Sequence, residues 1–199
     1  RFGKRGEKRS MQPFAASSIP LVTLGTFLLW FGWFGFNGFS QLAMGTFDDV
    51  NAISKIAVNT HLAGAAGTVT GAALTRLIGG KTDIVMMLNG ALAGLVAITA
   101  EPLTPGPITA MVIESIGAVI MYYGTKLLES LGLDDVVGAI PVHMFAGIFG
   151  TLVVPLTNTD TSFGTQLIGV ISVCVFSFIL SWITFSTLKS TVGLRISRA

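Results

Sequence analysis

Residues 136–156 read VVGAIPVHMFAGIFGTLVVPL and include no Asp, Glu, Lys or Arg. A helix of this length, rising about 1.5 Å per residue, would cross the roughly 30 Å hydrocarbon core of a bilayer. Its single histidine, His143, lies near the middle of the stretch. An ionisable side chain at that depth is costly and usually faces a bundle interior or a conduction path. A neutral, hydrogen-bonded core histidine is the alternative, and the residue alone favours neither interpretation.

The composition is that of an integral membrane protein. The 199 residues are 51% hydrophobic and 11% charged, with a mean hydropathy of +0.75. A soluble domain would carry about twice that share of charge. The 24 glycines suit membrane helices that pack backbone to backbone. A soluble protein is excluded by the low charge, and an outer-membrane barrel by the continuous apolar runs, which lack period-two alternation.

Six apolar spans are predicted, so the expected fold is an all-α membrane protein with six transmembrane helices. The spans are residues 21–36 (extending to about 44), 56–78, 84–100, 108–128, 136–156 and 166–188. Turn and breaker residues separate them: Asp48-Asp49, Gly79-Gly80-Lys81, 102–107, Gly132 and 158–163. We divide the chain into a cytoplasmic loop segment (1–18), a six-span region (19–188) and the start of a cytoplasmic tail (189–199).

The distribution of basic residues predicts the orientation. Six spans place both ends on one side, which receives every Lys and Arg of the 12 except Lys55. By the positive-inside rule both termini are cytoplasmic, and we expect a multi-pass protein of the cell inner (plasma) membrane. The basic N-terminal stretch is then a membrane flank and not a nucleic-acid-binding segment. No signal peptide is visible.

The first span ends in an aromatic run, WFGWFGFNGFS, at residues 30–40. On a helix Trp33, Phe36 and Ser40 fall at i, i+3 and i+7, on one face, at the end that faces outward. Two rings and a hydroxyl on one stripe could hold a cation, because aromatic faces attract cations by about 0.5–2 kcal/mol. An interfacial aromatic belt is the alternative, and the spacing alone favours the belt.

The residues beside His143 indicate a helix that is loosened locally. Pro141 removes a backbone donor and frees the carbonyl of Val137. Gly147 and Gly150 let a neighbouring helix or a narrow path come close. We expect the imidazole to be neutral at rest, because burial disfavours its charged form.

The other polar residues favour structural roles. Glu114, about two turns into the fourth span, suits a proton or cation contact, but a protonated or hydrogen-bonded carboxyl at a helix interface is favoured. His61 is expected near the outer interface, without a special role. Asp134 and Asp135 are expected to cap the fifth span, and Cys174 to be a small core residue. The sequence has no catalytic constellation or metal-ligand cluster, so we expect no enzyme, cofactor or metal.

Five segments, in order, resemble the ammonium transporter family (Amt/Mep, related to Rhesus proteins). They are LGTFLLWFGWFGFNGFS, NTHLAGAAG, MLNGALAGLVAITA, DDVVGAIPVHMFAGIFGTL and VGLRIS. The resemblance implies a fold of eleven helices, with two inverted repeats of five and a final helix, assembled as a homotrimer in the lipid bilayer. It also implies that ammonium loses its proton at an outer aromatic vestibule and that ammonia crosses an apolar pore lined by two histidines. Phe36 would belong to the outer gate, Trp33 would line the nearby pore, Ser40 would accept a hydrogen bond from ammonium, and His143 would be the second pore histidine.

Departures from the family pattern limit what the resemblance implies. The chain opens at what resembles the loop between the fifth and sixth family helices, so the first gate aromatic and first pore histidine would lie outside it. His61 stands where the family usually has Asn, at the wrong depth for a pore partner. Phe39 replaces a usually small residue, so the vestibule would be tighter. The family tail that meets a cytoplasmic PII-type regulator stops soon after VGLRIS. Ammonium transport by a larger protein is therefore expected, with an ammonium-sensing domain or an inactive fragment as alternatives.

Overall fold

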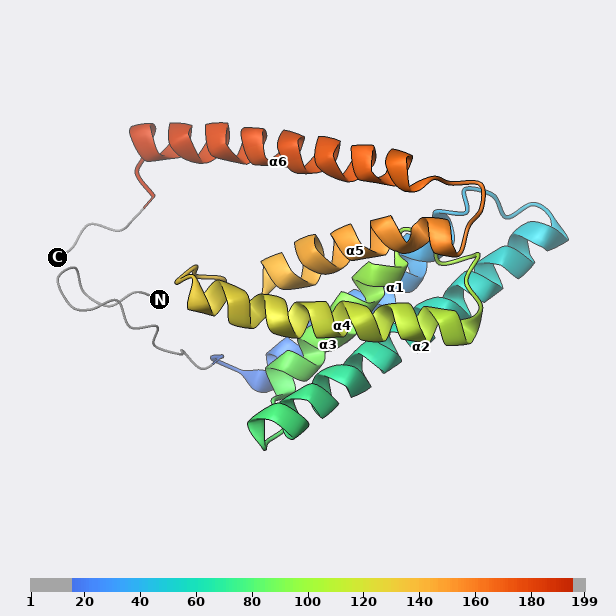
Figure 1. Cartoon of the computed structure of the whole chain (residues 1–199), viewed down its shortest axis with the longest axis horizontal. Helices are drawn as coiled ribbons and strands as arrows, with labels where there is room; N and C mark the ends of the chain where they lie inside the picture. The colour runs from blue at the N-terminus through green and yellow to red at the C-terminus, as the bar shows by residue number, and fades with distance from the viewer. Residues whose placement is uncertain (1–15, 195–199) are drawn as a thin grey trace.

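The computed structural model describes residues 16–194, and this part of the chain is built from helices (Figure 1). In chain order they are α1 Ile19–Phe39, α2 Phe47–Gly79, α3 Ile84–Ile98, α4 Pro107–Ser130, the π-helix η1 Ile140–Phe145, α5 Ala146–Val153, the 3₁₀ helix η2 Val154–Leu156 and α6 Phe163–Thr191. Each of the six predicted spans is thus helical. The predicted loop segment at 1–15, with its basic residues, and the last residues 195–199 lie outside the described part.

Three spans differ from their predicted bounds. The first was expected to extend to about residue 44, but α1 ends at Phe39, and the chain turns through Leu42, which has a φ of +59°. The second helix begins at Phe47 and not near residue 56, because Thr46 and Asp49 form a reciprocal capping box that starts the helix in a polar segment. The fifth span begins at Ile140 and not at 136, because Gly138 has a φ of +78°, a conformation that a helix cannot contain. Pro141, predicted to loosen the interior of this helix, lies instead in its first turn, where a missing N–H breaks no helical hydrogen bond. The turn Ile140–Phe145 is π-helical.

The helices alternate in direction, so the connections gather at two ends (Figure 1). One end holds the start of α1, the α2–α3 turn, the α4–η1 loop and the end of α6. Among residues 16–194, three helices are long and apolar enough to cross a membrane, namely α1, α4 and α6. The stretches Ile84–Ile98 and Ile140–Leu156 are shorter apolar helices. The α2 helix has the length but carries more polar residues.

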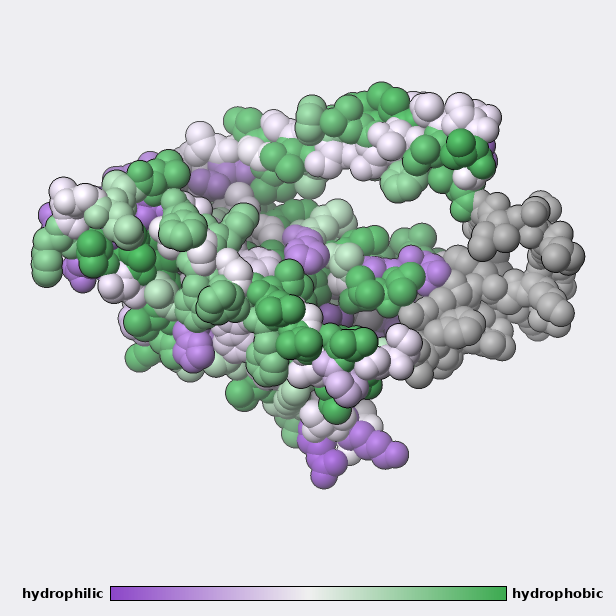
Figure 2. Space-filling model, turned by 180° about the vertical axis from the view of Figure 1, so that it is seen from behind, coloured by the Kyte–Doolittle hydropathy of each residue, from purple (hydrophilic) through white to green (hydrophobic). Residues whose placement is uncertain are grey.

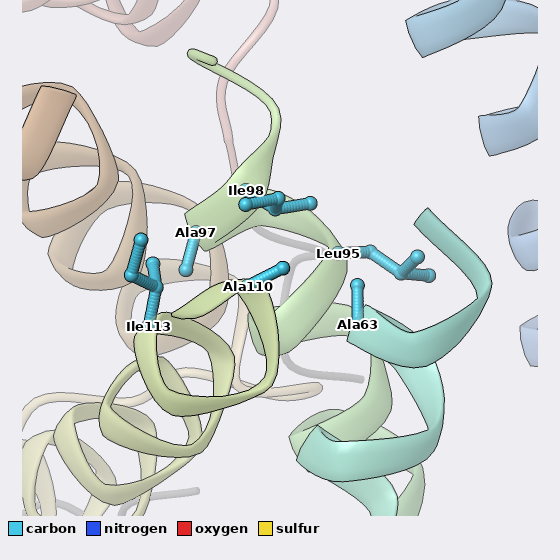
Figure 3. Close-up of a cluster of buried hydrophobic side chains, with 6 residues drawn as sticks. All are labelled: Ala63, Leu95, Ala97, Ile98, Ala110 and Ile113. Atoms are coloured by element: carbon cyan, nitrogen blue, oxygen red, sulfur yellow. The ribbon is translucent and has the colours of Figure 1, made fainter. Parts of the chain in front are cut away.

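The core forms where α2, α3 and α4 all pack against one another. Glycines bring the backbones of α2 and α3 together: a Cβ added to Gly94 would lie 2.8 Å from the carbonyl oxygen of Ala63. Such close approach is how membrane helices associate when apolar burial against lipid contributes little. A cluster of buried side chains from these three helices lies at the centre (Figure 3): Ala63, Leu95, Ala97, Ile98, Ala110 and Ile113.

The last helix stands apart from this core. None of the α6 residues is buried, and it contacts only α5 and η2 at its first turns. Figure 2 shows a mostly hydrophobic α6 separated from the body by an open gap along much of its length. Cys174 is therefore exposed on α6, and the prediction that it is a core residue is wrong for this chain.

Candidate functional site

Trp33 is held in place by a hydrogen bond to α3. Its indole Nε1 donates to Thr99 Oγ1 at 2.8 Å, and Thr99 Oγ1 in turn donates to the carbonyl of Leu95 at 2.6 Å. The half-buried ring also packs against the central cluster of Figure 3. The C-terminal end of α3 thus fixes the orientation of this indole, because both its polar atom and its ring have partners.

Phe36 and Ser40 lie on the open side of the same helix. The Phe36 ring is 63% exposed, and its centroid lies 6.1 Å from that of Trp33 at an interplanar angle of 55°. Ser40 Oγ donates to the carbonyl of Phe36 at 2.7 Å, which leaves its lone pairs free to accept. A shallow hollow over this surface is lined by Gly32, Gly35, Phe36, Phe39, Ser40 and Leu42. Trp33 does not line the hollow. All of the lining residues belong to α1 and the turn that follows it, so the hollow is bounded on one side only.

His61 lies on α2 against two aromatic rings of α1. Its centroid is 6.1 Å from that of Phe34, nearly parallel, and 5.7 Å from that of Trp30. The side chain is otherwise exposed. Nearby, Asn37 Nδ2 donates to Thr60 Oγ1 at 2.9 Å and ties the two helices together. No contact in the described part of the chain joins His61 to His143.

The entry to the fifth span is fixed by two polar side chains. The Asp135 carboxylate accepts from the backbone N–H groups of Gly138, Ala139 and Ile140, at 3.1, 2.9 and 2.8 Å, so its predicted capping role is confirmed. Asn89 Nδ2 of α3 donates at 3.0 Å to the carbonyl of Val137. The prediction that Pro141 frees this carbonyl within a helix is wrong, because Val137 lies before the helix begins, at the turn where Gly138 has a positive φ.

His143 projects from the π-helical turn that follows. Its side chain is exposed, and within residues 16–194 it makes no side-chain hydrogen bond and no ring contact. The residues before it, Pro141 and Val142, are buried against α4 and the central bundle. Gly150 packs on the Ala97 backbone of α3, as expected from its small size. A tightly packed segment therefore carries the imidazole and leaves it exposed.

The α3 helix supports both candidate regions, the aromatic residues of α1 and the segment that carries His143. Thr99, the residue that caps the C-terminal end of α3, holds Trp33, and Asn89 holds the turn before His143. These two α3 residues are ten positions apart, or about 15 Å along the helix. Sequence reasoning missed both of them. Their only signal was that each is a polar side chain in an otherwise apolar span.

Glu114 does not belong to this site. It is completely buried in α4, and neither carboxylate oxygen has a hydrogen-bond partner among the described residues. A fully buried carboxyl agrees with the predicted position at a helix interface, and not with a group that contacts a solute.

Comparisons with known proteins agree on one group of relatives. A sequence model of the Ammonium Transporter Family matches residues 1–199. Ammonium transporter Amt2 of Archaeoglobus fulgidus is 39% identical over 218 residues, covering 99% of this chain and 46% of that protein. Putative ammonium transporter sll0537 of Synechocystis is 38% identical over 207 residues, covering 99% of this chain and 37% of that protein. The chain thus spans less than half the length of these two curated relatives.

Solved structures with the same helix arrangement include a protein described as "Sensor Amt Protein", with a TM-score of 0.87 and 33% identity over 94% of this chain and 48% of that one. Rh50 of Nitrosomonas europaea has a TM-score of 0.75 and 28% identity, covering 89% of this chain and 46% of that one. The all-helical fold expected from the sequence is thus shared with these proteins.

Proposed function

The chain belongs to the ammonium transporter family, and we propose that it forms one wall of a pathway that carries ammonium, or ammonia derived from it, across a membrane. Because the chain spans less than half of the relatives in the preceding comparison, the opposite wall would come from the rest of a longer protein. The chain would supply the second inverted repeat and the last helix of that protein.

The observation that carries the proposal is the exposure of His143. A histidine that has no side-chain partner among residues 16–194, and that a packed apolar segment presents in the first turn of the fifth span, suits a pore wall better than a core. Moving a small cation into such a lumen costs many kcal/mol, on the order of tens in the idealised limit. Carrying neutral ammonia removes most of that cost if the proton is handled separately. A neutral imidazole can align ammonia or relay its proton, and potassium cannot lose its charge in this way.

The outer end of α1 supports a recruitment site. Phe36 would contribute to the gate, and Trp33 would present a ring whose orientation Thr99 fixes. Ser40, whose hydroxyl has acceptor capacity to spare, would take a hydrogen bond from ammonium. The Phe39 ring, also part of the hollow, would narrow the vestibule.

Orientation and assembly follow from the same reasoning. In the described part of the chain Arg76, Lys81, Lys126 and Lys189 lie toward the ends of α2, α4 and α6 that share one side, and Lys55 lies toward the other. We propose that the basic side is cytoplasmic, in an inner (plasma) membrane, and that the longer protein is a homotrimer. A PII-type regulator acting through a following tail is part of the same proposal.

The test is a His143→Ala substitution in the full-length protein, read as methylammonium uptake and ammonium-dependent current. We expect transport or its selectivity over potassium to be lost, and His61→Ala, which removes the other histidine of this chain, to transport as wild type does. Unchanged uptake and unchanged selectivity in the His143 variant would contradict the proposal.

A second candidate function is ammonium sensing. It is favoured by the match to the structure described as a sensor Amt protein, with a TM-score of 0.87. A signalling module encoded after Ala199, with little flux through the purified protein, would support sensing over transport.

A further inference from the structure

Glu114 is a buried acid that the proposed transport path does not use. It lies seven residues after the start of α4 at Pro107, or about 10 Å along the helix. Its exposed fraction is 0%, and both carboxyl oxygens lack a hydrogen-bond partner in the described part of the chain. Because the side chain is already covered by its own chain, a partner from elsewhere in a longer protein would not reach it without the bundle opening.

The surroundings of Glu114 offer no opposite charge. The same face of α4 carries Ala110, Gly117 and Met121, and α4 packs against α2, α3, η1 and α5. The α3 helix has no ionisable residue, and the histidine of η1, His143, is exposed. The ionisable residues of α2 are Asp48, Asp49, Lys55, His61 and Arg76, and none of them is buried. The other fully buried polar side chains among residues 16–194 are Thr and Asn only.

An isolated carboxylate in such an environment is not a stable species. The idealised cost of moving an ionised carboxylate into an apolar medium is on the order of tens of kcal/mol, and a real group takes up a proton instead. Glu101 gives the contrast within the same chain. Its carboxylate, in the outer α3–α4 loop, accepts hydrogen bonds from the N–H groups of Leu103 and Thr104 and from Asn158 Nδ2.

We propose that Glu114 is a proton-binding site between α2, α3 and α4, where the carboxyl is held as the neutral acid and acts as a packing element. The ligand is a single proton, and the site is separate from the exposed surface of Phe36 and His143. This inference does not depend on which solute the protein carries. It implies that an uncharged side chain of similar size can replace Glu114, whereas a hidden ion pair would not tolerate that change.

The direct test is infrared spectroscopy of the full-length protein in lipid vesicles at neutral pH. Wild type should show a carboxylic-acid carbonyl band that Glu114→Gln removes and Glu101→Gln leaves unchanged. A carbonyl band that persists in the spectrum of the Glu114→Gln variant, or one that Glu101→Gln removes instead, would overturn the proposal, because the acid would then lie elsewhere.

A second variant keeps the inference testable if the glutamine protein folds poorly. Glu114→Leu removes every polar atom, and replacing a polar group that has no partner by an apolar one of similar size is nearly neutral or stabilising. We therefore expect the leucine variant to keep the thermal unfolding temperature of wild type. A large decrease in the unfolding temperature of the leucine variant would show that the substitution leaves a partner of Glu114 unpaired. This result would contradict the proposal that Glu114 is a neutral acid without a partner.

Discussion

The hydrogen bond between Trp33 and Thr99 should contribute measurably to the stability of the helix bundle. It joins α1 to α3 at 2.8 Å in a half-buried setting. Trp33→Phe removes the donor, and Thr99→Val removes the acceptor while keeping the shape of the side chain. The valine change leaves a partly buried indole N–H without a partner, which costs about 1–3 kcal/mol.

The magnitude follows from the setting of the bond. Hydrogen bonds between membrane helices contribute about 0.6 kcal/mol on average and up to about 1.7 kcal/mol. For a short bond whose acceptor is itself fixed by Leu95, we expect a coupling energy of about 1 kcal/mol, or roughly fivefold in the folding equilibrium. The assay is the free energy of unfolding in mixed micelles, measured for both single variants and the double variant.

Trp30 supplies the matched control. It lies one turn before Trp33 on the same helix, and its Nε1 is buried without a hydrogen-bond partner in the described residues. Trp30→Phe therefore removes the same ring area without breaking a hydrogen bond, and its effect should add to that of Thr99→Val. Additive energies in the Trp33–Thr99 pair, or equal coupling in the Trp30–Thr99 pair, would refute the reasoning.

Two further changes test the packing that supports the site. Gly94→Leu should destabilise the bundle by about 1–3 kcal/mol or more, because the new side chain would meet the Ala63 carbonyl. Gly25→Leu is the control: a Cβ added at Gly25 has no atom within 4 Å, so this change should have little effect in the same unfolding assay. Asp135→Ala should cost about 1–2 kcal/mol of unfolding free energy, since the carboxylate accepts from three backbone N–H groups. Asp135→Asn should restore only part of the loss, because its one amide oxygen can replace Oδ1, which accepts from Gly138 and Ala139, but not Oδ2, which accepts from Ile140. Equal costs for Ala and Asn would contradict the capping role.

Helix number and approximate position were predictable because hydropathy alone determines them. The spans at 84–100 and 108–128 match α3 and α4 to within a few residues. The start of α2 was not predictable from hydropathy, because Thr46 and Asp49 begin a helix in a polar segment by satisfying its free N–H groups. The late start of the fifth span depends on the positive φ of Gly138, which hydropathy does not report.

The candidate site was predictable in its residues but not in their partners. Helical spacing correctly placed Trp33 and Phe36 close together, with ring centroids 6.1 Å apart. It gave no indication that the Trp33 indole turns toward Thr99, 66 positions away in the sequence, and leaves the hollow to Phe36 and Ser40. Contacts over such a separation depend on how helices pack, and the spacing within one helix does not encode that.

The same limit explains why His143 and Glu114 were hard to tell apart in the sequence. Each is one ionisable residue inside a long apolar span, and hydropathy reports the depth of such a residue without reporting the direction in which it projects. The structure separates them, because His143 is exposed on a packed segment while Glu114 is fully buried. An exposed imidazole can meet a solute that passes along the wall, whereas a covered carboxyl can exchange only a proton, and only when the bundle opens. Depth in the membrane therefore identifies costly residues, and lateral orientation decides which of them can act on a transported species.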